Sequence, residues 1–297
     1  FAVGDASFSS NIAYNISRKF DIPLCLYYGD DYYLNQNANS LFKILHNKRT
    51  LKAHDRNLYH SSKLFAIGDL MAKEYEKKYH RKFYVIRTGV DEIKPDIPIK
   101  TNENRITLSY VGGIHLNRWK SLIELGEILR KVQNIINKEI ILNIYTLAIP
   151  DRFITEELNK KPLNFCGAIY GKEVNRVLMS SDILVHVESF DKEYRALTRL
   201  SISTKIPEYL ASGKCILCFG PNEVASIKLI EENEVGLTIT DNDGEKEINE
   251  KVVKILIDKQ KREIYGSKAK KFAEENFNRK CNNELLRFHL NDAIISL

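Results

Sequence analysis

Residues 201–221 set the strongest limits on how this chain can fold. The stretch reads SISTKIPEYLASGKCILCFGP. Ser203 and Thr204 are residue types that cap helix N-termini, and Gly213 suits the left-handed position that ends a helix. The apolar run at 215–219 is typical of a strand that is covered on both faces. The pattern therefore predicts a short helix followed by a buried strand of an α/β sheet.

The beginning of this helix also favours anion binding. The free N–H groups and the positive dipole end of a helix suit a phosphate, and Glu208 lies about one turn further on. Two interpretations of Glu208 stay open. It is an exposed helix carboxylate, or it accepts hydrogen bonds from a pair of sugar hydroxyls.

The motif STKIPEYLASG, followed by an apolar strand and Gly-Pro, resembles the donor-binding signature of GT-B glycosyltransferases, in particular the retaining family 4. The resemblance implies that Glu208 holds the ribose of a sugar nucleotide. It also implies that the backbone at Ser203 and Thr204 meets the diphosphate, and we assign the adjacent Lys205 to the same donor site. The family has a second glutamate eight residues earlier, where this chain has Leu200, so the usual sugar contact has no counterpart there.

Alternating strand and helix patterns predict an α/β fold with two Rossmann-like, doubly wound domains, which the GT-B resemblance places facing a cleft. The segments FAIGDLMAKEY and SYVGG resemble the end of the first GT-B domain and the start of the second, and FAEENFN resembles the final helix. Several strands of the first domain have no counterpart, so we expect it to be truncated. The predicted parts are an acceptor-side domain at 1–93, a nucleotide-sugar-binding domain at 94–275 that begins with a linker at 94–103, and a helix at 276–297 that crosses back.

Composition narrows the class of protein. Hydrophobic residues make up 43% and charged residues 28% of the 297 residues, as in globular rather than disordered proteins. No apolar run approaches the roughly 18 residues that a membrane span needs, and the first residues lack the pattern of a signal peptide. The net charge of +6 suits nucleotide phosphates or an anionic membrane surface and is too small to indicate nucleic acid.

The cysteines indicate a compartment rather than a site. Five cysteines at irregular spacing argue against a disulfide framework and favour a reducing environment. We therefore expect a cytoplasmic protein, with peripheral attachment to the inner face of the membrane as an extension of that expectation. Cys215 and Cys218 form a C-x-x-C without a second pair, so core packing is favoured over zinc binding. The sequence has no D-x-D motif, and we expect no metal and no cofactor apart from the donor substrate.

Gly112 and Gly113 follow a predicted strand and let a phosphate approach the backbone closely, although an ordinary turn explains the pair equally well. In family 4, an arginine follows the first glycine and a lysine comes further along, and both contact the donor diphosphate. Here Gly113 replaces the arginine, Lys120 resembles the lysine, and Arg118 is placed to supply the missing charge. Such cations stabilise the leaving nucleotide diphosphate, which makes Lys120 a catalytic candidate as well.

Three carboxylates are candidates for the chemistry at the sugar. Glu188 ends a predicted strand, where side chains line the cleft of such sheets. It either takes over the sugar contact that Leu200 lacks or is a solvated loop residue. Asp30 and Asp31 lie in a loop that faces the donor sugar in family 4. Either one orients or deprotonates an acceptor hydroxyl, or the pair simply caps the next helix.

The sequence therefore predicts a glycosyltransferase of the hexosyltransferase type. It would move a sugar from a nucleotide-diphosphate donor to a hydroxyl of a glycan or lipid-linked acceptor, with retention, in surface polysaccharide biosynthesis. An anionic membrane surface is a further expected partner, through the basic stretch at 39–59 and the terminal helix. Two alternatives stay open: a non-catalytic nucleotide-sugar-binding subunit, and a nucleotide-sugar epimerase of the same architecture, which a cleft poor in histidine disfavours.

Overall fold

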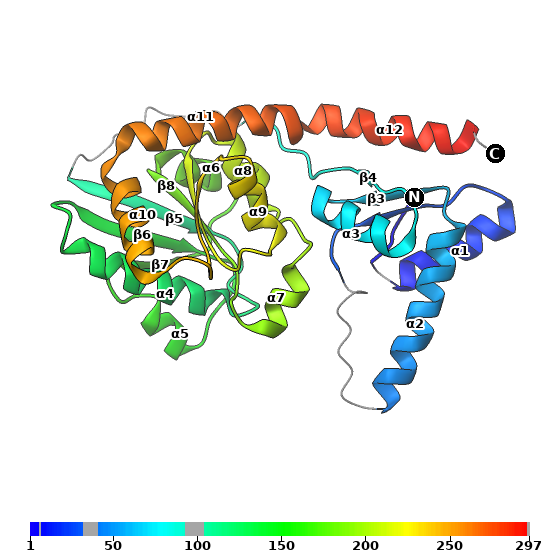
Figure 1. The fold of residues 1–297 in the computed structure, drawn as a ribbon, viewed down its shortest axis with the longest axis horizontal. Helices are drawn as coiled ribbons and strands as arrows, with labels where there is room; N and C mark the ends of the chain where they lie inside the picture. Colours follow the sequence, from blue (N-terminus) through cyan, green and yellow to red (C-terminus); the bar gives the residue numbers. More distant parts are fainter. Residues whose placement is uncertain (6, 32–40, 93–103, 296–297) are drawn as a thin grey trace. The chain divides into compact units, whose positions relative to one another are not determined.

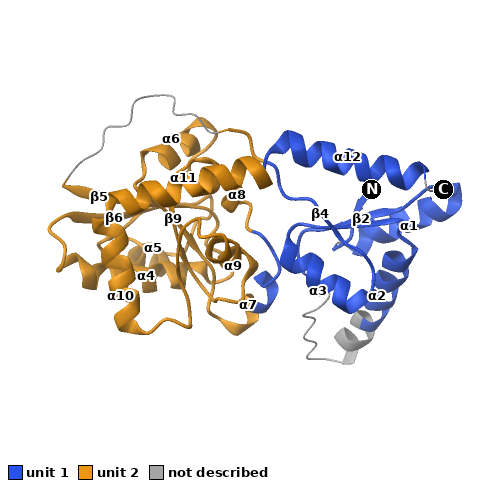
Figure 2. Ribbon diagram, turned by 45° about the horizontal axis from the view of Figure 1, so that its top comes forward, with its two compact units in different colours: residues 1–89, 196–202, 277–297 blue, residues 90–195, 203–276 orange. Residues whose placement is uncertain are grey.

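The computed structural model describes residues 1–5, 7–31, 41–92 and 104–295. The chain divides into two compact units (Figure 2), of which unit 1 comprises residues 1–89, 196–202 and 277–297, and unit 2 comprises residues 90–195 and 203–276. The segment 196–202, which the sequence-based division assigned to the second domain, groups with unit 1. The predicted linker at 94–103 lies outside the described residues.

Unit 2 is built on a six-stranded parallel sheet in the order β10-β9-β8-β5-β6-β7 (Figure 1). This arrangement confirms the predicted doubly wound fold for the second half of the chain. The strands are β5 (Arg105–Val111), β6 (Glu139–Tyr145), β7 (Leu163–Gly167), β8 (Ile183–Val187), β9 (Cys215–Phe219) and β10 (Leu237–Ile239). The helices are α4 (Arg118–Gln133), α5 (Arg152–Glu157), α6 (Lys172–Ser180), α7 (Lys192–Thr198), which runs into unit 1, α8 (Lys205–Ala211), α9 (Ala225–Glu232), α10 (Glu245–Ile257) and α11 (Lys259–Asn276).

The strand order of unit 2 changes direction at β5. The chain first adds β6 and β7 on one side of β5 and then adds β8, β9 and β10 on the other. Connections that leave two neighbouring strands in opposite directions open a crevice at the carboxyl edge, and ligands of open α/β sheets bind there. The residues that follow Val111 and Val187, the last residues of β5 and β8, therefore lie where a ligand is expected.

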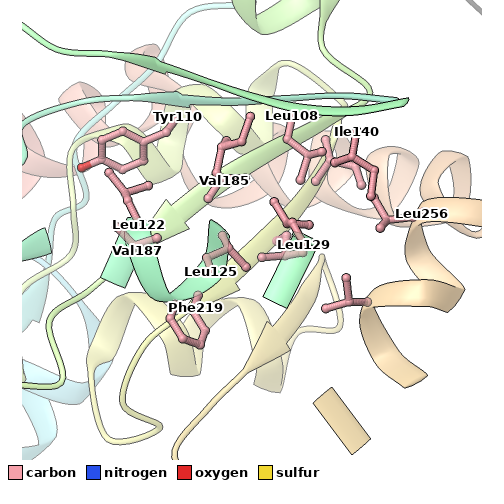
Figure 3. Packing of buried hydrophobic residues seen from close by; sticks show 14 of the residues in the cluster. Leu108, Tyr110, Leu122, Leu125, Leu129, Ile140, Val185, Val187, Phe219 and Leu256 are labelled. Carbon is pink, nitrogen blue, oxygen red and sulfur yellow. The ribbon is translucent and has the colours of Figure 1, made fainter. Parts of the chain in front are cut away.

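The core of unit 2 fixes the positions of these strand ends. Leu122, Leu125 and Leu129 repeat along one face of α4, are fully buried, and belong to the same cluster as Val185 and Val187 of β8 (Figure 3). The strands β8 and β9 are buried along their whole length. This burial on both faces explains the continuously apolar sequence at 215–219 and confirms that prediction.

Helix α8 begins and ends where the sequence predicts, but its cap differs from the prediction. Gly213 has a φ of 67°, the left-handed conformation expected after the last turn. Thr204 is the N-cap residue, yet its hydroxyl makes no capping hydrogen bond. Its backbone is already helical (φ −60°, ψ −16°), whereas a capping side chain needs an extended residue. The hydroxyl-cap prediction for Thr204 is therefore wrong.

Unit 1 has a four-stranded parallel sheet in the order β1-β2-β3-β4. In the part of the chain that the structure describes, these strands and the helices between them form the α/β succession that the sequence predicts. The elements are β1 (Ala2–Val3), α1 (Ser7–Phe20), β2 (Cys25–Tyr28), α2 (Leu41–His60), β3 (Lys63–Ala66), α3 (Asp69–Tyr79), β4 (Tyr84–Val85) and the C-terminal α12 (Arg279–Ile295).

Candidate functional site

A cavity of about 590 Å³ lies in unit 2 at the carboxyl edge of the sheet. Its volume falls within the range of small-molecule and cofactor sites. Glu208, Gly112 and Gly113, which are far apart in the sequence, share its wall. The other lining residues are Val111, His115, Tyr145, Thr146, Leu147, Ala148, Ile169, Gly171, Val174 and Asn175.

The two glycines make room for two basic side chains. A β-carbon at Gly112 would lie 2.6 Å from Lys205 Nζ, and a β-carbon at Gly113 would lie 2.5 Å from His115 Nδ1. Lys205 and His115 therefore lie directly against the backbone of the loop that follows β5. A larger residue at either position would have to displace a side chain, which gives a physical reason for the Gly-Gly pair.

Arg118 and Glu188 form a buried ion pair beside this loop. Arg118 Nη2 lies 2.9 Å and Nε lies 3.1 Å from Glu188 Oε2, and the two side chains are 9% and 2% exposed. Neither residue lines the cavity. The structure thus places Glu188, the candidate for a sugar contact, against Arg118 rather than in the cavity. It also shows that Arg118, the candidate for the missing phosphate charge, already has a counter-ion.

Further contacts fix both the backbone and the carboxylate of Glu188. Ser121 Oγ donates to the Glu188 backbone carbonyl at 2.9 Å, and His186 Nε2 lies 3.2 Å from Glu188 Oε1. Burial alone would raise the pKa of the Glu188 carboxyl, but His186, Arg118 and Lys205 outweigh it and hold the pKa below its usual value. Burial lowers the pKa of His186, which favours the neutral form of this histidine.

Lys205 is the second cation at the loop. Its Nζ lies 5.4 Å from the centre of the Tyr110 ring. Of the described residues, no carboxylate lies within ion-pair distance of this ammonium group. Burial, reinforced by the neighbouring Arg118, lowers the pKa of Lys205 to about 8, although Glu188 acts in the opposite direction.

His115 is a cavity residue that sequence reasoning missed. Its Nε2 lies 3.3 Å from Arg118 Nη1. Because a guanidinium only donates hydrogen bonds, Nε2 must accept this one, and the neutral ring then carries its proton on Nδ1. Desolvation, Arg118 and Lys205 all lower the pKa of His115. The ring therefore presents an N–H donor next to Gly113. One sequence signal was its spacing: His115 lies three residues before Arg118, the first residue of α4.

Lys120 lies apart from the cavity wall. Its Nζ pairs with Asp191 at 3.0 Å, and both side chains are about half exposed. Asn117 Nδ2 also donates to Asp191. At the start of α8, Ser203 N–H donates to Ser226 Oγ at 2.9 Å, and neither Ser203 nor Thr204 lines the cavity. Among the predicted donor residues, the structure thus brings Gly112, Gly113 and Glu208 together on the cavity wall, and it places Lys205, which does not line the cavity itself, against Gly112.

Asp30 and Asp31 have different environments in unit 1. Asp31 is buried and accepts a hydrogen bond from Tyr75 Oη at 2.9 Å, whereas Asp30 is exposed. The N–H groups of Gly29 and Asp30 donate to Asp5 Oδ2, both at 2.9 Å. Asp5 therefore fixes this loop, and burial raises its pKa. Of the two predicted acceptor-side carboxylates, Asp30 is the accessible one.

Hydrogen bonds of Tyr209 connect helix α8 to the end of β5. The Val111 N–H donates to Tyr209 Oη at 2.9 Å, and this hydroxyl lies 3.3 Å from the Val111 carbonyl. Tyr209→Phe would leave the Val111 N–H without this acceptor. We expect the free energy of unfolding to fall by about 2 kcal/mol, measured by urea denaturation. An unchanged midpoint would show that the amide finds another partner.

Two features are absent from the described residues, a cluster of metal ligands and a helix able to cross a membrane. No group of three or more His, Cys, Asp or Glu side chains is arranged to hold a metal ion within these residues. Over the same residues, none of the helices combines the length and the apolar character that a membrane crossing requires. Cys215 and Cys218 are buried free thiols, and burial raises the pKa of both. Their place in β9 confirms the prediction of core packing.

Comparison with solved structures identifies the fold. The chain is similar to sucrose-phosphate synthase of Thermosynechococcus elongatus (13% identity, TM-score 0.72, 98% of this chain and 73% of that one). It is also similar to WaaG, a glycosyltransferase involved in lipopolysaccharide biosynthesis (18%, 0.61, 91% and 79%), and to HepE of Anabaena in complex with UDP and glucose (14%, 0.66, 97% and 76%). The chain thus has the fold of GT-B glycosyltransferases, as predicted. The truncation of its first domain stays a prediction.

A curated relative adds a sequence match. The chain is 26% identical over 194 residues to an uncharacterized glycosyltransferase of Methanocaldococcus jannaschii. These residues are 64% of this chain and 46% of that protein, so the chain spans about half the length of this relative. A comparison with protein-family models finds no match.

Proposed function

We propose that this chain is a glycosyltransferase that binds a nucleoside-diphosphate sugar in the cavity of unit 2. The proposal rests on one observation. Glu208, Gly112 and Gly113 line the same cavity, at the edge of the sheet where the strand order changes direction. A carboxylate suits two neighbouring ribose hydroxyls, and a glycine loop suits a phosphate. The names of the similar proteins, including one bound to UDP and glucose, support this reading.

The proposed reaction transfers the sugar, with retention, to a hydroxyl of a glycan or lipid-linked acceptor in surface polysaccharide biosynthesis. Asp30 is the proposed acceptor-side carboxylate, because it is exposed while Asp31 is buried. We further propose a cytoplasmic location with contact to an anionic membrane surface through the basic α2 and α12. Sedimentation with vesicles that contain anionic lipids tests this contact, and equal sedimentation with neutral vesicles would argue against it.

The donor site is tested by thermal shift with UDP, GDP, ADP and CDP, each in large excess. Saturation with the correct nucleotide is expected to raise the melting temperature by about 5 °C. Glu208→Ala removes the ribose acceptor and should weaken binding of that nucleotide about tenfold. Glu173→Ala is the matched control, since Glu173 is an exposed carboxylate of the neighbouring α6 outside the cavity wall.

If no nucleotide raises the melting temperature at millimolar concentration, the donor-site proposal is wrong. Turnover of a radiolabelled donor then separates the remaining classes. Transfer of label to a glycan or lipid acceptor supports the glycosyltransferase, and conversion of the nucleotide sugar alone would indicate an epimerase. Nucleotide binding without any turnover would indicate a non-catalytic subunit.

A further inference from the structure

The basic and acidic groups around Gly112 form an electrostatic cluster. Its charged members are Arg118, Glu188 and Lys205, and two histidines, His115 and His186, lie within their influence. Burial lowers the pKa of both histidines, which favours their neutral forms. Two cations then face one carboxylate, and the cluster has a net charge of +1. A partly desolvated net charge is unfavourable, so a bound anion would complete this site.

The two groups that remain available to an anion lie against neighbouring glycines of the loop, Lys205 from α8 and His115 from the loop itself. Arg118 is committed to Glu188 in a bidentate pair. Lys205 Nζ lies against Gly112, and the Nδ1–H of His115 lies against Gly113. Both glycines line the cavity that also contains Glu208. A nucleotide whose ribose meets Glu208 would thus carry its phosphates toward these two donors.

We propose that Lys205 and His115 bind the diphosphate of the nucleotide sugar, and that the buried Arg118–Glu188 pair positions His115. This inference rests on the proposed donor site and assigns its phosphate contacts. It differs from the assignment by family resemblance, which places the charges at Gly113 and Lys120. In this chain Gly113 has no charge, and Lys120 is paired with Asp191 outside the cavity wall.

The roles of the two donors differ. Lys205 offers a full charge and neutralises part of the diphosphate. His115 offers a directional N–H, and its tautomer is set by the hydrogen bond that Nε2 accepts from Arg118. Glu188 in turn fixes the guanidinium that makes this bond. Arg118 and Glu188 are therefore positioning residues, which act on the anion through His115.

Binding of inorganic pyrophosphate and of UDP, measured by calorimetry at pH 7, tests the assignment. Pyrophosphate probes the phosphate contacts without the base or ribose. Lys205→Met is expected to weaken both ligands by about 10- to 100-fold, and His115→Phe by about tenfold, the usual effect of a lost charge-assisted hydrogen bond. Lys172→Met is the matched control, because Lys172 is an exposed lysine next to the cavity residue Gly171, whereas Lys205 lies against the glycine loop.

A pH readout separates a phosphate contact from a merely structural role. In the free protein the pKa of Lys205 is lowered to about 8, and a bound diphosphate favours the charged ammonium and raises this pKa. Binding at pH 8 should therefore take up about half a proton, seen as a dependence of the binding heat on buffer ionisation enthalpy. Affinity should fall as the pH rises above 8. Lys205→Arg keeps the charge, so it should retain most of the affinity and lose the proton uptake.

Several outcomes would overturn the inference. If UDP binds but Lys205→Met and His115→Phe leave its affinity unchanged, or if Lys120→Met weakens it instead, the phosphate contacts lie elsewhere while the donor site stands. If pyrophosphate binds through Lys205 but no sugar is transferred, the anion site stands and the proposed activity fails. If neither pyrophosphate nor any nucleotide binds the unmodified protein, both proposals fail together.

Discussion

Glu188→Ala is expected to lower the free energy of unfolding of unit 2 by about 3–5 kcal/mol, the usual cost of leaving one partner of a buried ion pair alone. Arg118 is only 9% exposed and would keep its charge without a carboxylate. The single tryptophan of the chain, Trp119, lies next to Arg118 in α4. Its fluorescence during urea denaturation therefore reports on the unit that contains the pair.

The double variant Glu188→Ala/Arg118→Met is the control for this prediction. When both charges are removed, the desolvation penalty disappears with the attraction, so most of the lost stability should return. Glu188→Gln keeps the hydrogen-bond acceptor and should lie between the unmodified protein and Glu188→Ala. A Glu188→Ala midpoint equal to that of the unmodified protein would show that Arg118 reaches water without cost.

Gly266→Val should destabilise unit 2 by about 3 kcal/mol, at the upper end of the usual cost of overpacking. Gly266 lies in α11 where this helix crosses the turn between α8 and β9, and a β-carbon there would lie 2.1 Å from the Gly213 carbonyl oxygen. That oxygen belongs to the backbone and cannot rotate away as a side chain would. The helix must therefore move from its place against α8.

Ser267→Val is the matched control for Gly266→Val. Ser267 is the next residue of α11 and is exposed, so the substitution adds a β-branched residue to the same helix without a clash. Its effect on the free energy of unfolding should stay within about 0.5 kcal/mol. If both variants unfold at the same urea concentration, the close approach of α11 to Gly213 does not contribute to stability.

Local sequence patterns were sufficient to predict much of the secondary structure of unit 2. The predicted strand at 215–219 agrees with β9, and the predicted strand that leads to Glu188 agrees with β8. These segments have strong local signals, since buried parallel strands are continuously apolar and glycine ends helices by its conformation. The N-cap at Thr204 was less predictable, because the hydroxyl's direction depends on a backbone conformation that distant contacts decide.

The candidate site shows where sequence reasoning ends. The motif at 201–221 and the glycine pair at 112–113 were recognisable separately, and the sheet order brings them to one cavity. Which lysine faces the loop was not predictable. The sequence makes both Lys120 and Lys205 candidates for a phosphate contact. Only the folded structure shows that Lys120 pairs with Asp191 and that Lys205 lies against Gly112. The spacing of His115 from Arg118 was the one sequence signal for this histidine, and it was too weak to assign a function that depends on a tautomer set by Arg118.

The hydroxyl of Tyr209 has a consequence for how quickly a ligand can be captured. It joins the helix that bears Lys205 and Glu208 to the last residue of β5, from which the glycine loop continues. This hydrogen bond fixes the positions of two walls of the cavity relative to each other before any ligand arrives. A preformed wall loses little conformational entropy on binding and needs no slow rearrangement. Nucleotide capture by unit 2 would then be limited by diffusion and orientation, rather than by ordering of the site.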